Sequence, residues 1–302
     1  MIKEKKPEKI ILDLSYIKEV RDILCKISRS GILCILKEDN QSFIEQDMLV
    51  ENAYLSQQDN FIYITDDGRK ASEYKSADKA VLIYLHEGNK DEAFPGNRYF
   101  IEGFEDADAT YFTRIYQREK KIPWVIGETE RLIIREMTPE DTEALYALYE
   151  DKSVVEFMED LPQNSEEEET YIADYIDKMY GFFGFGMWLV ELKETGEVIG
   201  RVGFQNCETQ GNNANESEAN GTKYDGADNS SAFGESMQDL VELGFLIAPK
   251  YQKQGYAYEA CKVAIAYMEN EFPEYNIVAR CKKENEQAIA LCRKLGIHYW
   301  LR

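Results

Sequence analysis

The segment Tyr251-Gln252-Lys253-Gln254-Gly255-Tyr256-Ala257-Tyr258-Glu259-Ala260 joins an apolar run to an amphipathic stretch. The apolar run, residues 240–247, predicts a strand, and the stretch that begins near Gly255 predicts a helix. A helix start leaves several backbone N–H groups without intrahelical partners at the positive end of the helix dipole. Gly255 permits close approach of a ligand to this backbone, and the small side chain of Ala257 does so as well. The segment therefore predicts a cradle for a diphosphate; the alternative is an ordinary helix start that contains a convenient glycine.

The residues on either side of this segment predict a regular order of strands and helices. Thr138-Pro139-Glu140-Asp141 is typical of a helix start, with Thr at the N-cap, Pro at the first helical position and acids in the first turn. Residues 206–238 are almost bare of apolar side chains and predict a flexible loop. The expected strands are 132–134, 187–192, 198–204, 240–247, 277–281 and 297–301, and the expected helices are 138–149, 166–180, one from 255, and 285–295.

This order and five local motifs resemble the GNAT N-acetyltransferase superfamily over residues 128–302. The string from Gln252 to Ala257 resembles the family's acyl-CoA pyrophosphate loop, [R/Q]-x-x-G-x-[G/A]. Residues 129–135 are similar to the first strand of the branch that includes ribosomal-protein N-terminal acetyltransferases. The other three motifs are similar to the hairpin, the central strand and the last helix of that branch; they are residues 188–203, residues 242–247, and Asn285-Glu286-Gln287-Ala288 followed by Lys294-Leu295-Gly296-Ile297.

The resemblance implies an α/β fold whose mixed sheet is splayed near its middle and flanked by helices. It also implies acetyl-CoA as the cosubstrate, with the pantetheine arm along the central strand and the diphosphate on the loop amides. A primary amine would attack the thioester directly, so the chemistry needs alignment, removal of the amine proton and oxyanion donors. The implied cofactor-binding residues are Leu246, Ile247, Gln252, Lys253, Gln254, Gly255, Tyr256, Ala257 and Asn285, and no metal is implied.

Catalytic roles implied by the resemblance each have a structural alternative. Glu242 is the expected base, directly or through water, or else the exposed residue of an alternating strand. The backbone N–H near Leu246 or Ile247 is the expected oxyanion donor. Cys292 occupies the position of a tyrosine general acid in many family members, although it could serve only in helix packing. Asn285 could bind the cofactor or simply cap its helix. The alternative to catalysis is a regulatory protein that binds CoA without turnover and uses its N-terminal domain as a scaffold.

The expected acceptor is an amine on a small molecule or at a protein N-terminus. The first two helices of this fold usually wall the acceptor site, and here they carry many carboxylates between Glu150 and Glu169. These carboxylates could attract a cationic amine, or could form an ordinary solvated face. The family usually has one more strand after the position of Ile297, whereas this sequence ends at Arg302. That strand is either absent or supplied by the N-terminal domain or by the partner in a homodimer.

Residues 1–125 predict a separate small Rossmann-like α/β module, because short apolar runs alternate there with amphipathic stretches. The Pro- and Gly-containing segment 120–127 is the expected boundary with the second domain, residues 126–302. Residues 62–68 give the module a faint resemblance to haloacid dehalogenases. That family's phosphatases need two aspartates spaced D-x-D, and Asp13-Leu14-Ser15 supplies one. Asp66-Asp67-Gly68 is more typical of a turn than of a metal site.

The composition restricts the binding partners. Among 302 residues, Lys+Arg 35 against Asp+Glu 57 leave a net charge of -22, which argues against general binding to nucleic acid or anionic membranes. The six cysteines show no CxxC spacing, which favours reduced thiols in a cytoplasmic protein. No apolar run approaches the length of about 18 residues that a membrane helix needs, so we expect a soluble protein.

Overall fold

The computed structural model describes residues 6–15, 20–36, 60–150, 171–207 and 240–301. The chain divides into two compact units, Ile2–Trp124 and Val125–Arg302. Several expected features lie wholly or mostly outside the described residues: the flexible loop at 206–238, the acidic residues 151–169 and the first part of the helix expected at 166–180.

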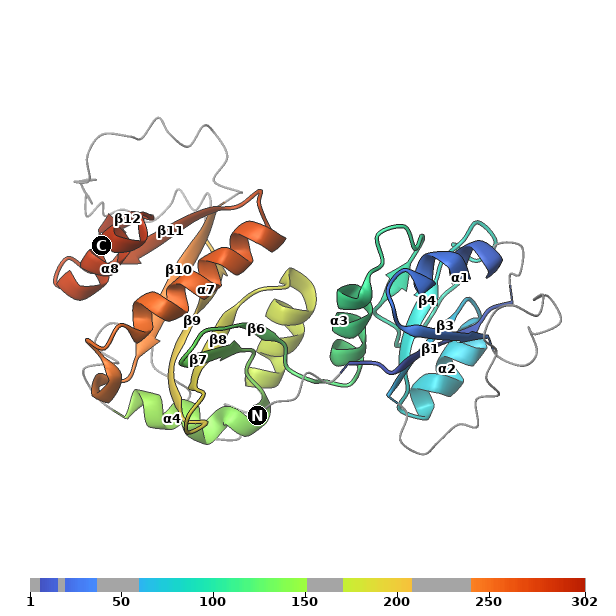
Figure 1. The fold of residues 1–302 in the computed structure, drawn as a ribbon, viewed down its shortest axis with the longest axis horizontal. Helices are drawn as coiled ribbons and strands as arrows, with labels where there is room; N and C mark the ends of the chain where they lie inside the picture. Colours follow the sequence, from blue (N-terminus) through green and yellow to red (C-terminus); the bar gives the residue numbers. More distant parts are fainter. Residues whose placement is uncertain (1–5, 16–19, 37–59, 151–170, 208–239, 302) are drawn as a thin grey trace, which may run out of the picture. The chain divides into compact units, whose positions relative to one another are not determined.

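The first unit contains a five-stranded parallel sheet in the order β2-β1-β3-β4-β5 (Figure 1). Every residue of β3 and β4 is buried, as expected for parallel strands covered on both faces. The elements are β1 (Lys9–Asp13), α1 (Val20–Ser28), β2 (Leu33–Leu36), β3 (Phe61–Thr65), α2 (Gly68–Ser76), β4 (Ala80–Tyr84), β5 (Phe100–Ile101) and α3 (Ala109–Glu119).

Helix α2 was not predicted from the sequence. The Asp67 side chain accepts hydrogen bonds from the backbone N–H groups of Arg69 (2.8 Å) and Lys70 (3.1 Å), so it caps the helix that begins at Gly68. The aspartate-glycine pair that resembled a turn therefore starts a helix. Buried Asp13 at the end of β1 pairs with Lys70 of α2 at 2.6 Å.

The second unit contains a seven-stranded mixed sheet in the order β12-β11-β10-β9-β8-β7-β6. Its strands are β6 (Val125–Glu128), β7 (Leu132–Arg135), β8 (Met187–Leu192), β9 (Val198–Asn206), β10 (Leu240–Ile247), β11 (Asn276–Cys281) and β12 (His298–Leu301). Strand β6 lies where we expected only a linker. Gly127 lies within β6. A Cβ at this position would lie 2.6 Å from the Val263 side chain, so the glycine permits close packing and does not mark a loop.

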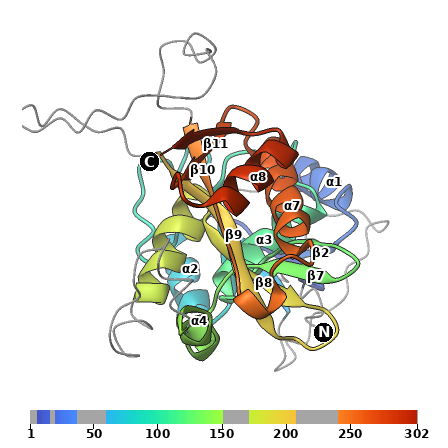
Figure 2. The ribbon, with the colours of Figure 1, turned by 90° about the vertical axis from the view of Figure 1, so that its left-hand side faces the viewer.

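Helices cover both faces of this sheet. Figure 2 shows α7 (Tyr256–Glu271) on one side of β9, with α4 (Thr142–Tyr149) and the helix at 171–183 on the other. The last turns of that helix form a π-helix, Ile176–Phe183. Helix α8 (Glu286–Leu295) packs next to β11 and β12. One core cluster, which includes Trp188, Phe204 and Met268, joins α4 and α7 to the sheet, and a smaller cluster around Cys292 joins α8 to β11.

The sheet opens between β10 and β11. These strands are paired in parallel only at Leu240–Glu242, opposite Asn276–Val278, and β10 then continues unpaired on that side to Ile247. On its other side, β10 stays paired with β9 from Val241 to Ile247. The expected splay in the middle of a mixed sheet is therefore confirmed, and it leaves one edge of β10 available to a ligand.

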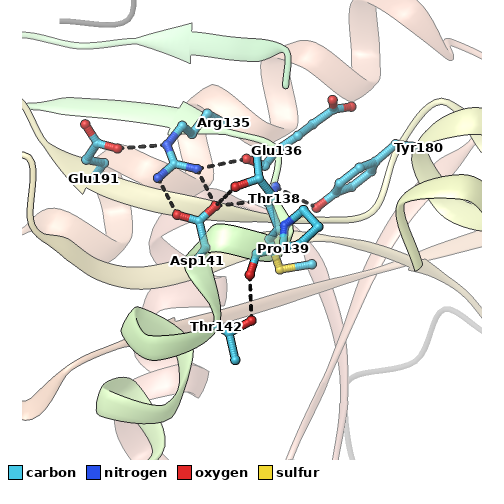
Figure 3. A network of polar contacts seen from close by, with 9 residues as sticks. Arg135, Glu136, Thr138, Pro139, Asp141, Thr142, Tyr180 and Glu191 are labelled. Carbon is cyan, nitrogen blue, oxygen red and sulfur yellow. Dashed lines mark hydrogen bonds and ion pairs between the residues drawn. The ribbon is translucent and has the colours of Figure 1, made fainter. Parts of the chain in front are cut away.

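A network of charged groups fixes the start of α4 to the sheet (Figure 3). The Arg135 guanidinium donates to both carboxylate oxygens of Asp141 at 2.8 Å and to Glu191 of β8 at 2.8 Å. Asp141 also accepts from the backbone N–H of Thr138 at 2.8 Å, completing the capping box of the 3-10 turn Pro139–Asp141. Arg135 thus joins the start of α4, six residues further along the chain, to β8, which lies 56 positions away.

Candidate functional site

A pocket of about 660 Å³ lies at the open end of the splay. Three elements form it: the end of β10, the first turn of α7 with its preceding loop, and one face of α8 with the residues just before it. The lining residues are Phe245, Leu246, Ile247, Tyr251, Gln252, Lys253, Gly255, Tyr256, Ala257, Tyr258, Glu284, Asn285, Glu286, Gln287, Ala288, Leu291 and Lys294. The structure thus brings together eight of the nine residues expected to bind the cofactor, and Gln254 alone of these does not line the pocket.

The loop before α7 presents a row of unused backbone donors. Gly255 has a φ of +88°, a left-handed conformation that favours glycine, and it turns the chain into the helix. The six successive N–H groups from Lys253 to Tyr258 donate no hydrogen bond to any described residue. They lie at the positive end of a 16-residue helix, so the site is suited to a group with several anionic oxygens.

Both glutamine side chains of the loop turn back onto its own backbone. Gln252 Nε2 donates to the Ile247 carbonyl at 2.9 Å, and Gln254 Nε2 donates to the Lys250 carbonyl at 3.0 Å. These bonds hold the loop in shape and leave its N–H groups free. The two glutamine side chains therefore position the loop, and its backbone N–H groups are available to a ligand.

Arg131 braces the loop from outside the pocket. Its guanidinium lies 4.2 Å from the ring centroid of Tyr256, donates to the Gln254 carbonyl at 3.2 Å, and pairs through Nε with Glu259 at 2.9 Å. Burial acts to raise the pKa of Glu259, but hydrogen bonds from Arg131 and Thr129 hold it below its usual value. No sequence signal indicated this role, because Arg131 and Glu259 are 128 positions apart.

The strand pairing determines which amides of β10 face the splay. The Leu240 carbonyl accepts from the N–H of Cys207, just past β9, and the Ala248 N–H donates to Ile199 of β9, so the backbone groups of even-numbered residues point toward β9. Alternation then directs the N–H groups of Phe245 and Ile247 toward the open edge. Leu246, one of the two expected oxyanion donors, lines the pocket, but its N–H faces β9. Phe245 was missed by the sequence analysis.

Glu242 occupies the last paired position of β10 before the splay opens. It is 7% exposed, and its Oε2 lies 3.4 Å from Arg280 Nε of β11. It does not line the pocket described above. The arginine stabilises a buried carboxylate there, so the residue is not the exposed member of an alternating strand that the sequence alternative described.

Cys292 and Asn285 have clear structural partners on α8. Cys292 is fully buried, and its Sγ lies 3.8 Å from Cys281 Sγ. The contact with Cys281 and burial raise the pKa of the Cys292 thiol above its usual value. This thiol is not at the pocket wall, so we do not retain it as a proton donor. Asn285 caps α8 by accepting from the Ala288 N–H at 3.0 Å, and it also lines the pocket.

Comparison with known proteins identifies the family. The model of the acetyltransferase (GNAT) domain matches residues 131–298, more than half of the chain. The chain therefore belongs to the GNAT acetyltransferase family and is an acetyltransferase, which confirms the resemblance found in the sequence. The match begins at Arg131 and ends at the first residue of β12, so it covers strands β7 to β11, the loop and the pocket.

Individual relatives are distant. The Bacillus subtilis (strain 168) protein YnaD, described as an uncharacterized N-acetyltransferase, is 27% identical over 169 residues, covering 56% of this chain and 80% of YnaD. A solved GNAT-family acetyltransferase from Bacillus anthracis is 24% identical, with a TM-score of 0.39 and coverage of 56% and 81%. The solved ribosomal-protein-S5-alanine acetyltransferase of Vibrio fischeri is 15% identical with a TM-score of 0.42, and the match covers 56% of this chain and 81% of that protein.

Proposed function

We propose that this enzyme transfers the acetyl group of acetyl-CoA to a primary amine by direct attack. The observation that carries the proposal is the row of six unused N–H groups at the Gly255 junction, next to the open edge of β10. The amides would bind the diphosphate, and the open strand edge would pair with the amide groups of the pantetheine arm. This arrangement would bring the thioester along β10 toward Glu242.

The proposed chemistry needs few groups. The amine nitrogen forms a bond to the thioester carbonyl carbon, and the bond from that carbon to sulfur breaks. Glu242, directly or through a water molecule, takes the proton that the amine loses. The N–H of Phe245 or Ile247 would stabilise the oxyanion, because both face the splay. The leaving thiolate takes a proton from solvent, since the Cys292 thiol is buried away from the pocket.

Release of free thiol from acetyl-CoA tests this proposal. The purified full-length chain is incubated with acetyl-CoA and a panel of primary amines, and thiol is followed with a colorimetric reagent. We expect release that depends on an amine, and we expect Glu242→Gln to lower kcat by about 100-fold with little effect on the KM for acetyl-CoA. Tight CoA binding without thiol release under any amine would contradict catalysis and favour a regulatory protein.

A further inference from the structure

Arg201 is a half-buried arginine on the face of the sheet that α4 covers. It belongs to β9, where it pairs with Leu246 of β10 on one side and Leu189 of β8 on the other. Leu246 lines the pocket at the splay. Arg201 therefore lies one strand away from the proposed cosubstrate site. Its side chain contacts α4, and Figure 2 shows α4 and α7 on opposite sides of the sheet.

The guanidinium of Arg201 has few protein partners. Nη1 donates to the Tyr149 hydroxyl at the end of α4 at 3.0 Å. Nε is fully enclosed and has no hydrogen-bond partner in the part of the chain that the structure describes. Burial acts to lower the pKa of Arg201, but the nearby hydroxyl groups of Tyr149, Tyr175 and Tyr180 outweigh it. The group is therefore a cation near three tyrosine hydroxyls, one of which accepts a hydrogen bond from it.

Other arginines of the same unit show how unusual this is. Among the described arginines of this unit that are not exposed, Arg131 pairs with Glu259, Arg135 with Asp141 and Glu191, and Arg280 with Glu242. Among the described residues, no carboxylate forms an ion pair with Arg201. The chain has Asp+Glu 57 against Lys+Arg 35, so acids to neutralise a structural arginine are abundant. A cation enclosed without a counter-charge is costly unless another molecule supplies one.

We propose that Arg201 binds a carboxylate on the acceptor, so that the enzyme acetylates amines that also carry a carboxylate. This inference rests on the proposed function and names its acceptor class. A planar guanidinium matches a carboxylate through paired N–H donors, and the aromatic rings of Tyr149 and Tyr175 would exclude water from that pair. The acceptor would lie on the face of the sheet that carries Arg201, near the end of α4, with its amine toward β10 and its carboxylate toward Arg201.

The test compares amines that differ only in the anionic group. L-Lysine is compared with cadaverine, which lacks the α-carboxylate, and glycylglycine with glycylglycinamide, in which the charge is removed. We expect kcat/KM to favour the carboxylate member of each pair by about 10- to 150-fold, the range for a hydrogen-bonded charge. β-Alanine against 2-aminoethylphosphonate separates a carboxylate from a phosphate-like group; an equal or greater rate for the phosphonate would overturn the assignment to a carboxylate.

Substitutions locate the effect. Arg201→Gln should abolish the preference while the KM for acetyl-CoA stays unchanged, and Arg201→Lys should restore part of it because the charge remains. Glycylglycine should also raise the melting temperature of the wild type more than glycylglycinamide does. The two ligands should have the same effect on the melting temperature of Arg201→Gln. If the Gln variant does not fold, the wild-type pairs alone decide.

Two outcomes would overturn the proposal: wild-type protein that treats acid and amide alike in both rate and melting temperature, or a folded Arg201→Gln variant that keeps the preference. Turnover without a carboxylate preference leaves the proposed function intact. Absence of both thiol release and CoA binding rejects the proposed function itself. The melting-temperature comparison of glycylglycine with glycylglycinamide still tests the carboxylate site in that case.

Discussion

At the residue scale, the site depends on how a short loop directs its backbone. Gly255 adopts a φ that other residues rarely adopt, and the turn it makes leaves the N–H groups of Lys253 to Tyr258 free. Those donors are useful only if the loop stays in place. Gln252, Gln254 and Arg131 hold it through contacts with carbonyl groups and with the Tyr256 ring.

Arg131→Met tests whether this brace supports cosubstrate binding. We expect the KM for acetyl-CoA to rise on the order of tenfold with kcat unchanged, because a partly exposed ion pair and a cation–π contact each contribute about 1 kcal/mol. Arg131→Lys should recover part of the loss, since a cation remains over Tyr256. Steady-state kinetics with varied acetyl-CoA measure both values. An unchanged KM, or an equal fall in kcat together with a lower melting temperature, would show that Arg131 has no specific role at the loop.

At the element scale, the fold depends on how β7 is joined to α4. Arg135 links β7 to β8 through Glu191 and to the start of α4 through Asp141 (Figure 3). All three side chains are largely buried, so their charges stabilise one another in place of water. Burial acts to raise the pKa of Asp141, but the Arg135 contacts outweigh it and hold the pKa below its usual value.

Asp141→Asn should lower the free energy of unfolding on the order of 2 kcal/mol at neutral pH, because Arg135 then keeps only Glu191 as a charged partner. The folded-state pKa of Asp141 is depressed, so its contribution is complete above the unfolded-state value of about 4 and is lost as pH falls through the lower folded-state value. The difference between wild type and variant should therefore shrink in strong acid. Urea titrations at several pH values measure it, and a difference that does not vary with pH would contradict this account.

Elements with a local signal could be predicted, and those determined by long-range contacts could not. The Thr138 cap, the hairpin at 187–204 and the Gly255 helix start are encoded within a few residues, and each was predicted. Strand β6 was missed because Pro123 and Gly127 resembled a linker, whereas Gly127 serves close packing against α7. The Arg131–Glu259 and Glu242–Arg280 pairs join distant segments, so no periodicity or spacing could reveal them.

At the scale of the whole molecule, the net charge of the chain opposes the binding of an anionic cosubstrate. The net charge of -22 would repel an anionic cosubstrate such as acetyl-CoA. Residues 250–302 hold nine Lys/Arg against six Asp/Glu, so the segment around the pocket has an excess of three positive charges. Lys253 and Lys294 both line the pocket.

Among the described residues, no helix is long and apolar enough to cross a membrane.

The central claim is that the Gly255 junction binds the diphosphate of acetyl-CoA. Gly255→Glu places bulk and a negative charge there, and Gly196→Glu is the matched control. Gly196 also has a left-handed φ, +74°, but lies in a hairpin turn with open space around it. Both variants therefore carry the same strain and the same added charge, so only the position differs.

Calorimetric titration of the full-length chain with coenzyme A measures the effect most directly. We expect the wild type and Gly196→Glu to bind with similar affinity, and a folded Gly255→Glu variant to lose binding by about 100-fold or more, the scale of a buried like-charge repulsion. Coenzyme A affinity that is the same in all three proteins would contradict the claim.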